Sequence, residues 1–357
     1  MKSRRWVINV IGFYLILLCL IVVIMITVDP YFHFHAPIKD MSYTMEPGDD
    51  LYMNDGILKN FDYDMIIIGS STTNGFSTAL ADKLFDKHSV RVTFQGEGFK
   101  GVNNRLQTAI DTHPDLKVVI RGLDSKFFIA DENWMGHDEY PEYLYDDNLW
   151  NDTSYILNGD ALCDKAVPEI IRTLKKEPAK SFDTYTDQYG KEGSRETVLS
   201  KYKRPLPADS PIDDQETEQM FIDLDNNLQK NVIDIIKANP DITFYLFFPP
   251  YSILWWDNYD QLGGGRLERR IQLEKSAIEK LLPYNNVHLF SFTSNHEWIC
   301  DLDNYGDYEH YTSNACSQIM EWMKNGDYEL SEENYMEYIN DITEFLCHYD
   351  YDAIFEE

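Results

Sequence analysis

One long apolar segment constrains the fold of this chain more than any other feature of its sequence. Residues 6–28 read WVINVIGFYLILLCLIVVIMITV and contain no charged side chain. Coiled as a helix at about 1.5 Å per residue, the segment would be roughly 34 Å long, which is enough to cross the hydrocarbon core of a bilayer. We therefore expect a transmembrane helix at residues 6–28.

The charges that flank this segment predict its orientation. Lys2, Arg4 and Arg5 precede it, and Asp29 follows it. Because basic residues tend to stay on the cytoplasmic side of a membrane, we expect residues 1–5 to be the cytoplasmic tail of a single-pass protein of the cell membrane, with the rest of the chain extracytoplasmic. A cleaved signal peptide is the alternative. The apolar run is longer than the core of a usual signal peptide and no A-x-A site follows it, which favours an uncleaved anchor.

The composition excludes several classes of protein. The chain of 357 residues has 31 Lys and Arg against 61 Asp and Glu, a net charge of −30. Because nucleic-acid binding needs a basic patch, we expect no nucleic-acid partner. Hydrophobic residues make up 43% and aromatic residues 14%, too many for a disordered chain. The five cysteines form no CxxC pair, which argues against a zinc site or a disulfide-framed mini-domain. We expect no metal and no other cofactor, and disulfide pairing stays open.

Short apolar runs after the anchor predict buried strands. They lie at residues 65–68, 90–94, 117–120, 242–248 and 287–290. Helical patterns at 102–112, 221–235 and 266–282 separate them. Strands that alternate with helices predict an α/β fold with a five-stranded parallel sheet covered on both faces. Ligands of such sheets bind outside the carboxyl ends of the strands, so functional residues are expected directly after each strand.

Breaks in this alternation predict the organisation of the chain. Residues 29–60 resemble a stalk that leads from the anchor to the main domain at 61–326. Within that domain, residues 130–215 lack clean periodicity and are interpreted as an insertion over the strand ends. Residues 327–357 contain no Lys or Arg and predict an acidic C-terminal helix or tail. Its apolar residues at helical spacing are Tyr335, Ile339, Ile342 and Leu346.

The first predicted strand runs into the sequence GSSTTNG at 69–75. A serine at a strand-to-helix turn can expose its hydroxyl at the carboxyl edge of the sheet, where backbone N–H groups of the helix start can stabilise an oxyanion. Ser and Thr are also common helix caps, so this turn by itself leaves both interpretations open.

A second polar block follows the fifth predicted strand. Asp307 and His310 form a D-x-x-H pair in the sequence NYGDYEHY. A serine hydroxyl is a weak nucleophile until an imidazole can take its proton. The imidazole in turn needs an acceptor that fixes its tautomer, and Asp307 is close enough in sequence to supply one. We therefore expect Ser71, His310 and Asp307 to meet at one edge of the sheet.

These blocks, IIIGSS after the first strand and DxxH near the end, resemble the first and last motif blocks of the SGNH (GDSL-like) hydrolase superfamily. The resemblance runs over about residues 62–323 and is closest to membrane-anchored bacterial members linked to acylation of cell-envelope polysaccharide or teichoic acid. It implies a flavodoxin-like three-layer sandwich with a Ser-His-Asp site. Ser71 matches the nucleophile, His310 the base and Asp307 its orienting partner.

The middle blocks depart from the family pattern. The second block of the family supplies an oxyanion-hole glycine, for which Gly98 is the preferred match and Gly101 nearly as good. The third block is G-x-N-D, whose Asn donates to the oxyanion, but this chain has Gly-Leu-Asp at 122–124. Because an ionised Asp cannot donate a hydrogen bond, Asp124 would be protonated or have another role. The backbone N–H groups of Ser71 and of a glycine remain as donors.

The resemblance implies a serine esterase or O-acyltransferase that acts on acyl esters, foremost acetyl esters, of a cell-surface glycan. Water and a glycan hydroxyl both stay open as acceptors. A multi-pass membrane acyltransferase is the partner typical of the family. The alternative is an inactive scaffold of the same fold that binds glycan or such a partner, which the missing Asn motivates. Asp124 and Tyr251, which follow the third and fourth predicted strands, are expected neighbours of the site.

Overall fold

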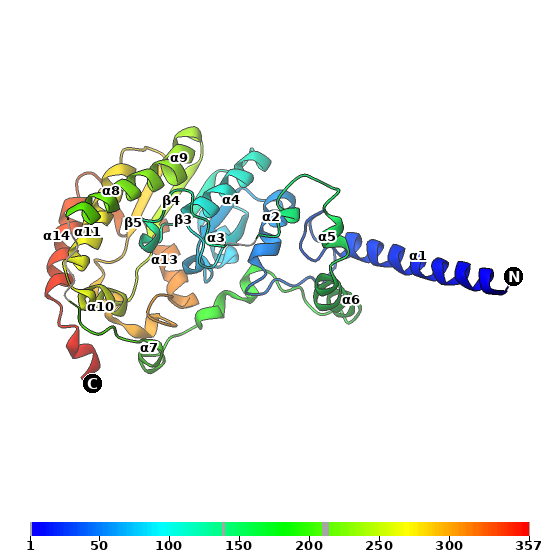
Figure 1. Cartoon of the computed structure of the whole chain (residues 1–357). Coiled ribbons are helices and arrows are strands. Elements are labelled where there is room, and N and C mark those ends of the chain that lie inside the picture. The colour runs from blue at the N-terminus through cyan, green and yellow to red at the C-terminus, as the bar shows by residue number, and fades with distance from the viewer. Residues whose placement is uncertain (1, 138–139, 209–213, 357) are drawn as a thin grey trace. The chain divides into compact units, whose positions relative to one another are not determined.

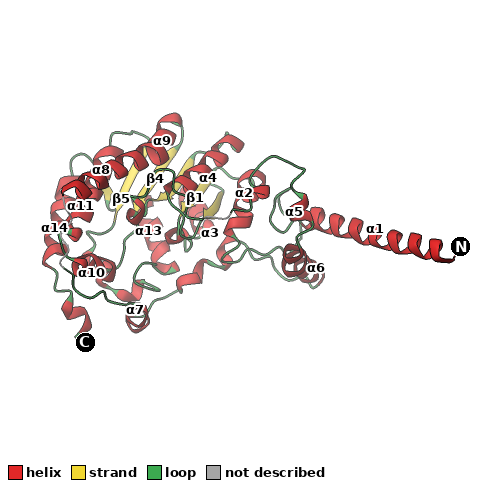
Figure 2. Cartoon of the chain, viewed as in Figure 1, coloured by secondary structure: helices red, strands yellow, loops and turns green. Residues whose placement is uncertain are grey.

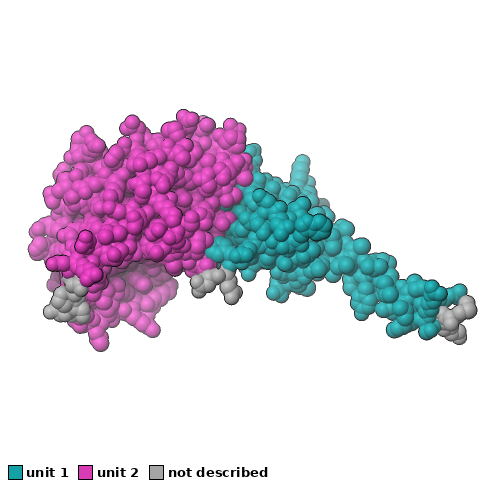
Figure 3. Space-filling model, turned by 45° about the horizontal axis from the view of Figure 1, so that its top comes forward, with its two compact units in different colours: residues 1–62, 139–184 teal, residues 63–138, 185–357 magenta. Residues whose placement is uncertain are grey.

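The computed structural model of the chain describes residues 2–137, 140–208 and 214–356. The chain divides into two compact units, coloured separately in Figure 3. Unit 1 comprises Met1–Asp62 and Glu139–Thr184, and unit 2 comprises Tyr63–Asp138 and Tyr185–Glu357. The segment expected as a stalk thus belongs to the same unit as much of the expected insertion. Residues 138–139 and 209–213 of that insertion, and both terminal residues, lie outside the described ranges.

Unit 1 begins with α1 (Lys2–Val28), the blue helix of Figure 1. From Ser3 to Val28 this helix is long and apolar enough to cross a membrane, and most of it is exposed. It is the one such helix among the residues that the structure describes. The other helices of unit 1 are short: α2 (Asp50–Asn60), η3 (Glu142–Leu144), α5 (Thr153–Ile156), the π-helical η4 (Ala161–Ala166), α6 (Val167–Leu174) and η5 (Phe182–Thr184).

A buried carboxylate fixes the turn that follows α1. Asp29 is fully buried, has a φ of 48°, and accepts hydrogen bonds from the backbone N–H groups of His33, Phe34 and His35 at 3.0, 2.7 and 2.9 Å. The hydroxyl of Tyr155, in α5, donates to the same carboxylate at 2.8 Å. Burial raises the pKa of Asp29 although these donors oppose the shift. The end of α1 is therefore bonded directly to α5.

Unit 2 is built on one sheet, whose strands are yellow in Figure 2. The strands are β1 (Met65–Gly69), β2 (Ser89–Thr93), β3 (Val118–Gly122), β4 (Thr243–Phe248), β5 (Val287–Ser291) and β6 (Glu329–Leu330), in the order β2-β1-β3-β4-β5-β6. The first five are parallel and lie at the predicted apolar runs. Every residue of β1, β2 and β3 is buried, so both faces of this half of the sheet are covered. The α/β class is confirmed.

The sixth strand corrects the prediction of a five-stranded parallel sheet. β6 runs antiparallel to β5, with Leu330 opposite Leu289 and Glu329 opposite Phe290. Its two residues lie in the segment expected as a helix or tail. A strand this short has no periodicity that a sequence could reveal. The chain reverses into it through Gly326 and Tyr328, both with positive φ.

Helices pack against the sheet in two groups of neighbours (Figure 1). In the first group α4, α8, α11 and α14 contact one another in turn, and in the second α3 contacts α13. Their bounds are α3 (Thr78–Phe85), α4 (Phe99–Thr112), α8 (Asp214–Leu228), α11 (Arg266–Leu281), α13 (Ser313–Asn325) and α14 (Tyr335–His348). The remaining helices of unit 2 are, in chain order, η1 (Ser71–Thr73), η2 (Ser125–Phe127), η6 (Thr186–Tyr189), α7 (Arg195–Lys201), the π-helical η7 (Gln229–Ile233), α9 (Asp234–Ala238), α10 (Ile253–Leu262), α12 (His296–Cys300), η8 (Leu302–Asn304) and η9 (Asp352–Phe355). α14 buries Ile339, Ile342 and Leu346 of the predicted apolar face.

Candidate active site

Ser71 begins the short helix η1, directly after β1 and one residue of turn. The preceding residue, Ser70, caps η1 and accepts a hydrogen bond from the backbone N–H of Thr72 at 3.5 Å. The strand can turn this tightly because Gly69 has no side chain, since a Cβ there would lie 2.7 Å from a side-chain carbon of Thr73. Ser71 is only 6% exposed. The cap interpretation of this serine-rich turn holds for Ser70, and Ser71 is the residue that follows the cap.

His310 lies on a loop that closes on itself before α13. Tyr305 and Tyr311 form an antiparallel bridge at its base, and the N–H of Gly306 donates to the carbonyl of His310 at 2.8 Å. Thr312 then caps α13 by accepting from the N–H of Ala315 at 3.3 Å. The loop is therefore held at both ends, which restricts where His310 can lie.

The structure brings Ser71, His310 and Asp307 together. The hydroxyl of Ser71 lies 2.8 Å from Nε2 of His310, and Nδ1 of His310 lies 3.0 and 2.9 Å from the two carboxylate oxygens of Asp307. An ionised carboxylate only accepts, so this contact assigns the proton to Nδ1 and leaves the lone pair of Nε2 facing the serine. The three side chains form a chain of hydrogen bonds from hydroxyl to imidazole to carboxylate.

Backbone N–H groups stabilise the ionised form of Asp307. The N–H groups of Glu309 and His310 donate to its Oδ1 at 2.9 and 2.8 Å. Burial alone would raise the pKa of Asp307, but the hydrogen bonds from the His310 ring and these amides outweigh it and hold the pKa below the ordinary value. Asp307 is therefore ionised at neutral pH, as a group that stabilises an imidazolium should be.

Tyr189, which the sequence did not single out, stacks on the imidazole. Its ring lies parallel to that of His310, with the centroids 4.1 Å apart and the planes 7° apart. The contact needs a glycine in the histidine loop, because a Cβ at Gly306 would lie 2.1 Å from the carbonyl oxygen of Tyr189. Tyr189 comes from η6, in the part of the predicted insertion that belongs to unit 2. No local motif marks it.

The side chain of Asp124 points toward the turn that carries Ser71 and accepts hydrogen bonds from several hydroxyls. It is 1% exposed and accepts from the hydroxyls of Ser70, of Thr72 at 3.2 Å and of Tyr251 at 2.6 Å. Burial and the nearby carboxylate raise the pKa of Tyr251 well above its ordinary value, so its phenol stays a donor. Asp124 and Tyr251 thus lie beside the site as expected, and they hold the loop that carries Ser71.

The two glycines expected at the oxyanion hole are engaged with Glu97. The backbone N–H of Gly98 donates to Oε1 of Glu97 at 3.1 Å, and the N–H of Gly136 donates to the same atom at 2.6 Å. Gly101 leaves room for this carboxylate, because a Cβ there would lie 2.1 Å from the carboxylate carbon of Glu97. Gly98 is covered by the ring of Trp134, which a Cβ would approach to 2.6 Å. In this structure Gly98 does not offer its N–H to an open site.

Two strand ends hold the histidine loop from outside. Lys126, after β3, pairs with Glu309, and the charges of Asp124 and Glu309 raise the pKa of Lys126 although burial opposes the shift. After β4, the hydroxyl of Ser252 donates to the carbonyl of Tyr308 at 2.6 Å. These bonds join the loop to the carboxyl ends of neighbouring strands, which explains how His310 reaches Ser71.

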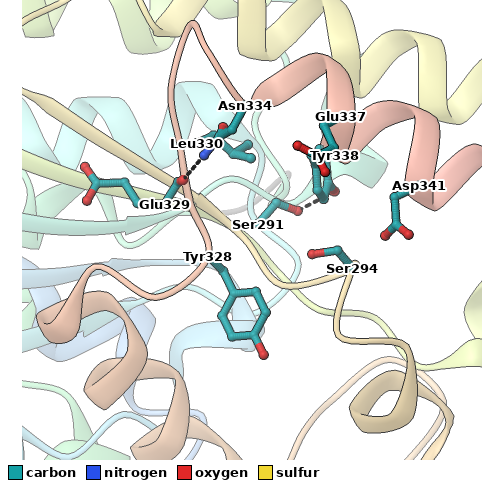
Figure 4. A pocket seen from close by; sticks show the side chains of 9 residues that line it. All are labelled: Ser291, Ser294, Tyr328, Glu329, Leu330, Asn334, Glu337, Tyr338 and Asp341. Atoms are coloured by element: carbon teal, nitrogen blue, oxygen red, sulfur yellow. Dashed lines mark hydrogen bonds between the residues drawn. The ribbon is translucent and has the colours of Figure 1, made fainter.

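A pocket of about 270 Å³ at the carboxyl end of β5 is separate from these residues (Figure 4). Ser291, Asn334, Glu337 and Asp341 are among its lining residues. Beneath it, the hydroxyls of Ser291 and Tyr338 lie 2.6 Å apart, and both oxygens are within hydrogen-bonding distance of buried Glu274. No residue of the Ser71 site lines this pocket.

The described residues contain no group of three His, Cys, Asp or Glu side chains that could hold a metal ion. All five cysteines are free, at positions 19, 163, 300, 316 and 347. Comparison with models of known protein families finds no match, and a search of curated proteins finds no similar sequence. The geometry of Ser71, His310 and Asp307 is therefore the feature of this chain that bears on its function.

Proposed function

We propose that the chain is a membrane-anchored serine acyl-transferring enzyme, an esterase or an O-acyltransferase. One observation carries the proposal: a hydroxyl, an imidazole and a carboxylate lie in hydrogen-bonding sequence at the carboxyl edge of a parallel sheet. This arrangement activates a serine, because the imidazole takes the hydroxyl proton while the carboxylate stabilises the resulting cation.

The reaction has two halves. In the first, Oγ of Ser71 attacks the acyl carbonyl of an ester, Nε2 of His310 takes its proton, and the same proton passes to the departing alcohol. In the second, water or a glycan hydroxyl loses its proton to His310 and attacks the acyl-serine, and Ser71 regains its proton as it leaves. Asp307 stays ionised throughout, and Tyr189 covers one face of the imidazole that becomes charged.

The oxyanion needs hydrogen-bond donors near Ser71. The backbone N–H of Ser71, at the start of η1, is the donor that the serine-bearing turn itself supplies. The N–H of Gly98 would serve only after the carboxylate of Glu97 moves off it. Asp124 does not replace the family Asn, because it already accepts three hydroxyl hydrogen bonds. We therefore assign Asp124 and Tyr251 to positioning Ser71.

The sheet order supports membership of the SGNH superfamily. Strands β2-β1-β3-β4-β5 follow the flavodoxin-like order, with the site at the carboxyl ends of its strands. Together with the GSS and DxxH blocks, this order favours a flavodoxin-like hydrolase fold, to which β6 is an antiparallel addition.

The anchor and the resemblance together suggest the substrate. With α1 in the cell membrane and its basic N-terminus in the cytoplasm, the sheet of unit 2 would face the cell exterior. Acyl esters of a cell-surface glycan, foremost acetyl esters, are the substrates that such a location favours. Transfer to a glycan would need an external acyl donor, and a multi-pass membrane acyltransferase held nearby in the same bilayer would supply it.

The proposal is tested by covalent labelling of the full chain in detergent with a fluorophosphonate probe. We expect the wild type to be labelled and Ser71→Ala to be unlabelled. Ser317→Ala is the matched control, because Ser317 lies in α13 and donates only to the carbonyl of Ser313. Equal labelling of wild type and Ser71→Ala would refute the assignment.

A second function, that of a scaffold without turnover, is favoured by one specific observation. The N–H of Gly98 is occupied by Glu97, and no Asn stands at position 124, so two family donors to the oxyanion are absent. In that case glycan binding should be unchanged in a variant with Ser71, Asp307 and His310 all replaced by Ala, and the wild type should show no turnover of acetyl esters. Turnover that disappears in Ser71→Ala would exclude the scaffold.

A further inference from the structure

An apolar stripe lies exposed on one side of α6, in unit 1. Val167, Ile171 and Leu174 are 37%, 45% and 79% exposed, and their spacing of four and three residues places them on one face of a helix. The opposite face points into unit 1, because Glu169 is fully buried. A contiguous apolar surface of this kind usually marks an interaction site.

The stripe continues into a groove beside the end of α1. The groove has a volume of about 300 Å³ and is lined by Val23, Ile24, Thr27, Val28, Met41, Ile170, Thr173 and Leu174. Leu174 belongs to both the stripe and the groove. Val23 is 59% exposed and belongs to both the groove and the outer surface of α1. The apolar surface of the anchor therefore runs without interruption onto α6.

The part of α1 that lies beside α6 determines how deep α6 would lie in a membrane that α1 spans. The anchor residues that line the groove extend from Val23 to Val28, a rise of roughly 7.5 Å at about 1.5 Å per residue. This stretch is the last part of the segment that can span a bilayer. Interfacial amphipathic helices bury their apolar faces by about 5–10 Å, which is the same depth. A helix beside residues 23–28 therefore lies at the membrane interface whenever α1 spans the membrane.

Hydrogen bonds keep α6 beside the anchor. The segment that follows α1 bonds to α6, with the N–H of Ser42 donating to the hydroxyl of Thr173 at 2.9 Å and the N–H of Thr44 donating to Glu169 at 2.7 Å. At the end of α1, Nε2 of His35 lies 2.9 Å from the carbonyl oxygen of Ile26. The groove is thus a fixed feature of unit 1.

The sequence of α6 and its flanks is locally basic, although Lys165 and Lys180 pair with Asp49 and Glu46. Although the whole protein has a net charge of −30, residues 165–180 contain five Lys and Arg against two Glu. Lys175 and Lys176 follow Leu174, are exposed, and have no ion pair within the part of the chain that the structure describes. Two unpaired lysines at the end of an apolar stripe are complementary to anionic lipid headgroups.

We propose that α6 is a membrane-docking helix, which inserts Val167, Ile171 and Leu174 into the outer leaflet while Lys175 and Lys176 bind anionic phospholipid headgroups. This inference rests on the proposed membrane anchor. A phospholipid acyl chain occupies the groove between α1 and α6. Unit 1 is then attached to the membrane at two points, through α1 and through α6.

The test measures membrane depth in the full chain, reconstituted into vesicles that contain phosphatidylglycerol. Cys19 and Cys163, the exposed cysteines, are replaced by Ser, and a nitroxide is attached to Leu174→Cys. Its collision rates with oxygen and with a water-soluble nickel chelate are compared by electron paramagnetic resonance. Ile16→Cys reports on the middle of α1, and Leu206→Cys, 87% exposed in unit 2, reports on an apolar residue outside unit 1.

We expect the label at Leu174 to favour oxygen over nickel several-fold, as the label at Ile16 should, while the label at Leu206 favours nickel. A label at Ile16 in hydrocarbon with one at Leu174 in water would overturn the docking proposal and leave the anchor standing. Labels in water at both positions would refute the anchor itself. Ile171→Cys provides a second site on the stripe if Leu174→Cys fails to fold.

The lysines are tested by charge removal. Lys175→Gln with Lys176→Gln should move the Leu174 label at least twofold toward nickel accessibility in vesicles containing phosphatidylglycerol, and should have little effect in phosphatidylcholine alone. The control removes the same charge from unit 2 through Lys191→Gln and Lys203→Gln, and should leave the label unchanged in both. The same shift in the control, or in phosphatidylcholine alone, would contradict recognition of anionic headgroups.

Discussion

The two units of this protein each contain a partly buried His–Asp pair, and the contact distances in the two pairs are closely alike. In unit 1, Nε2 of His33 lies 3.1 Å from Asp152, with side chains 10% and 4% exposed. In unit 2, Nδ1 of His310 lies 2.9 Å from Asp307, with side chains 16% and 24% exposed. The contact distance alone therefore does not tell a structural pair from a candidate catalytic one.

The difference lies in what else each imidazole meets. The ring of His33 packs edge-on against Phe34 and Tyr155, at centroid distances of 4.8 and 5.7 Å. The ring of His310 presents its second nitrogen to the hydroxyl of Ser71 at 2.8 Å. A histidine becomes a candidate general base when its second ring nitrogen is hydrogen-bonded to a hydroxyl that can act as a nucleophile.

A second carboxylate of unit 1, Asp29, differs from Asp307 in its burial and in the direction in which its pKa is shifted. Asp29, in unit 1, is completely enclosed, and burial raises its pKa despite its four donors. Asp307 is partly open to solvent, and its donors hold its pKa below the ordinary value. A carboxylate that fixes a turn can tolerate a high pKa, whereas one that supports an imidazolium must stay ionised.

The largest expected effect separates the two His–Asp pairs. Asp307→Asn should lower the rate of acyl-ester turnover by about 10⁴-fold, because the amide would stabilise the wrong imidazole tautomer. Asp152→Asn should leave the rate within about twofold of wild type, since among the described residues no hydroxyl is hydrogen-bonded to the ring of His33. Steady-state kinetics of both variants on an acetyl ester measure this contrast. Similar losses in the two variants would break the comparison.

Next in size is the removal of the acceptor behind Ser71. Asp124→Ala leaves buried hydroxyls of Ser70, Thr72 and Tyr251 without their acceptor, at about 1–3 kcal/mol each. We expect the free energy of unfolding to fall by about 3 kcal/mol or more. Asp124→Asn, whose amide oxygen still accepts, should cost less than half as much. Denaturant melts of the full chain in detergent compare the two, and equal losses would contradict the acceptor role.

Glu169 supplies a pH-dependent comparison from unit 1. Burial raises its pKa to about 7 from the ordinary 4.5, although the N–H and hydroxyl of Thr44 both donate to it. The folded protein therefore holds the proton more tightly than the unfolded chain does. The resulting penalty is absent below pH 4.5, grows as the pH rises toward about 7, and is constant above that.

Glu169→Gln should remove this penalty. The variant should be more stable than wild type at pH 8, by up to about 3 kcal/mol, and indistinguishable from it at pH 4. Thermal unfolding of both proteins in detergent at the two pH values measures the difference. A gain that is the same at both pH values would show that ionisation of Glu169 is not its cause.

The smallest predicted effect concerns the ring that covers His310. Tyr189→Ala should lower kcat by about tenfold with little change in KM, because the imidazole loses one fixed face and a favourable contact to its cation. Tyr189→Phe keeps the ring and should retain most of the activity. A loss in Tyr189→Phe as large as in Tyr189→Ala would assign the role to the hydroxyl instead of the stacked ring.

Much of the architecture is readable from local pattern. The strands β1 to β5 coincide with apolar runs because a strand buried on both faces needs apolar residues at successive positions. The GSS turn and the D-x-x-H pair are readable for a related reason, since each follows a strand that ends at the same edge. β6 is not predicted from the sequence, because a strand of two residues shows no periodicity.

The contacts around the candidate site are not readable in this way. Gly98 matches the expected glycine by position, yet its N–H is taken by Glu97, the neighbouring side chain. Tyr189 reaches His310 from a segment without periodicity, and Asp124 turns to hydroxyls on another strand end. Each outcome depends on which side chains the fold places around a polar group.

The sequence by itself determined the apolar N-terminal helix, the parallel strands and the residue types of the candidate site, because these depend on composition and short-range spacing. Only the tertiary structure decided that Ser71 meets His310, that Asp124 supports the serine loop, and that α6 lies beside the end of α1. Those arrangements join segments far apart in the chain. Their geometry is set by the packing of the whole fold, which no local window of sequence contains.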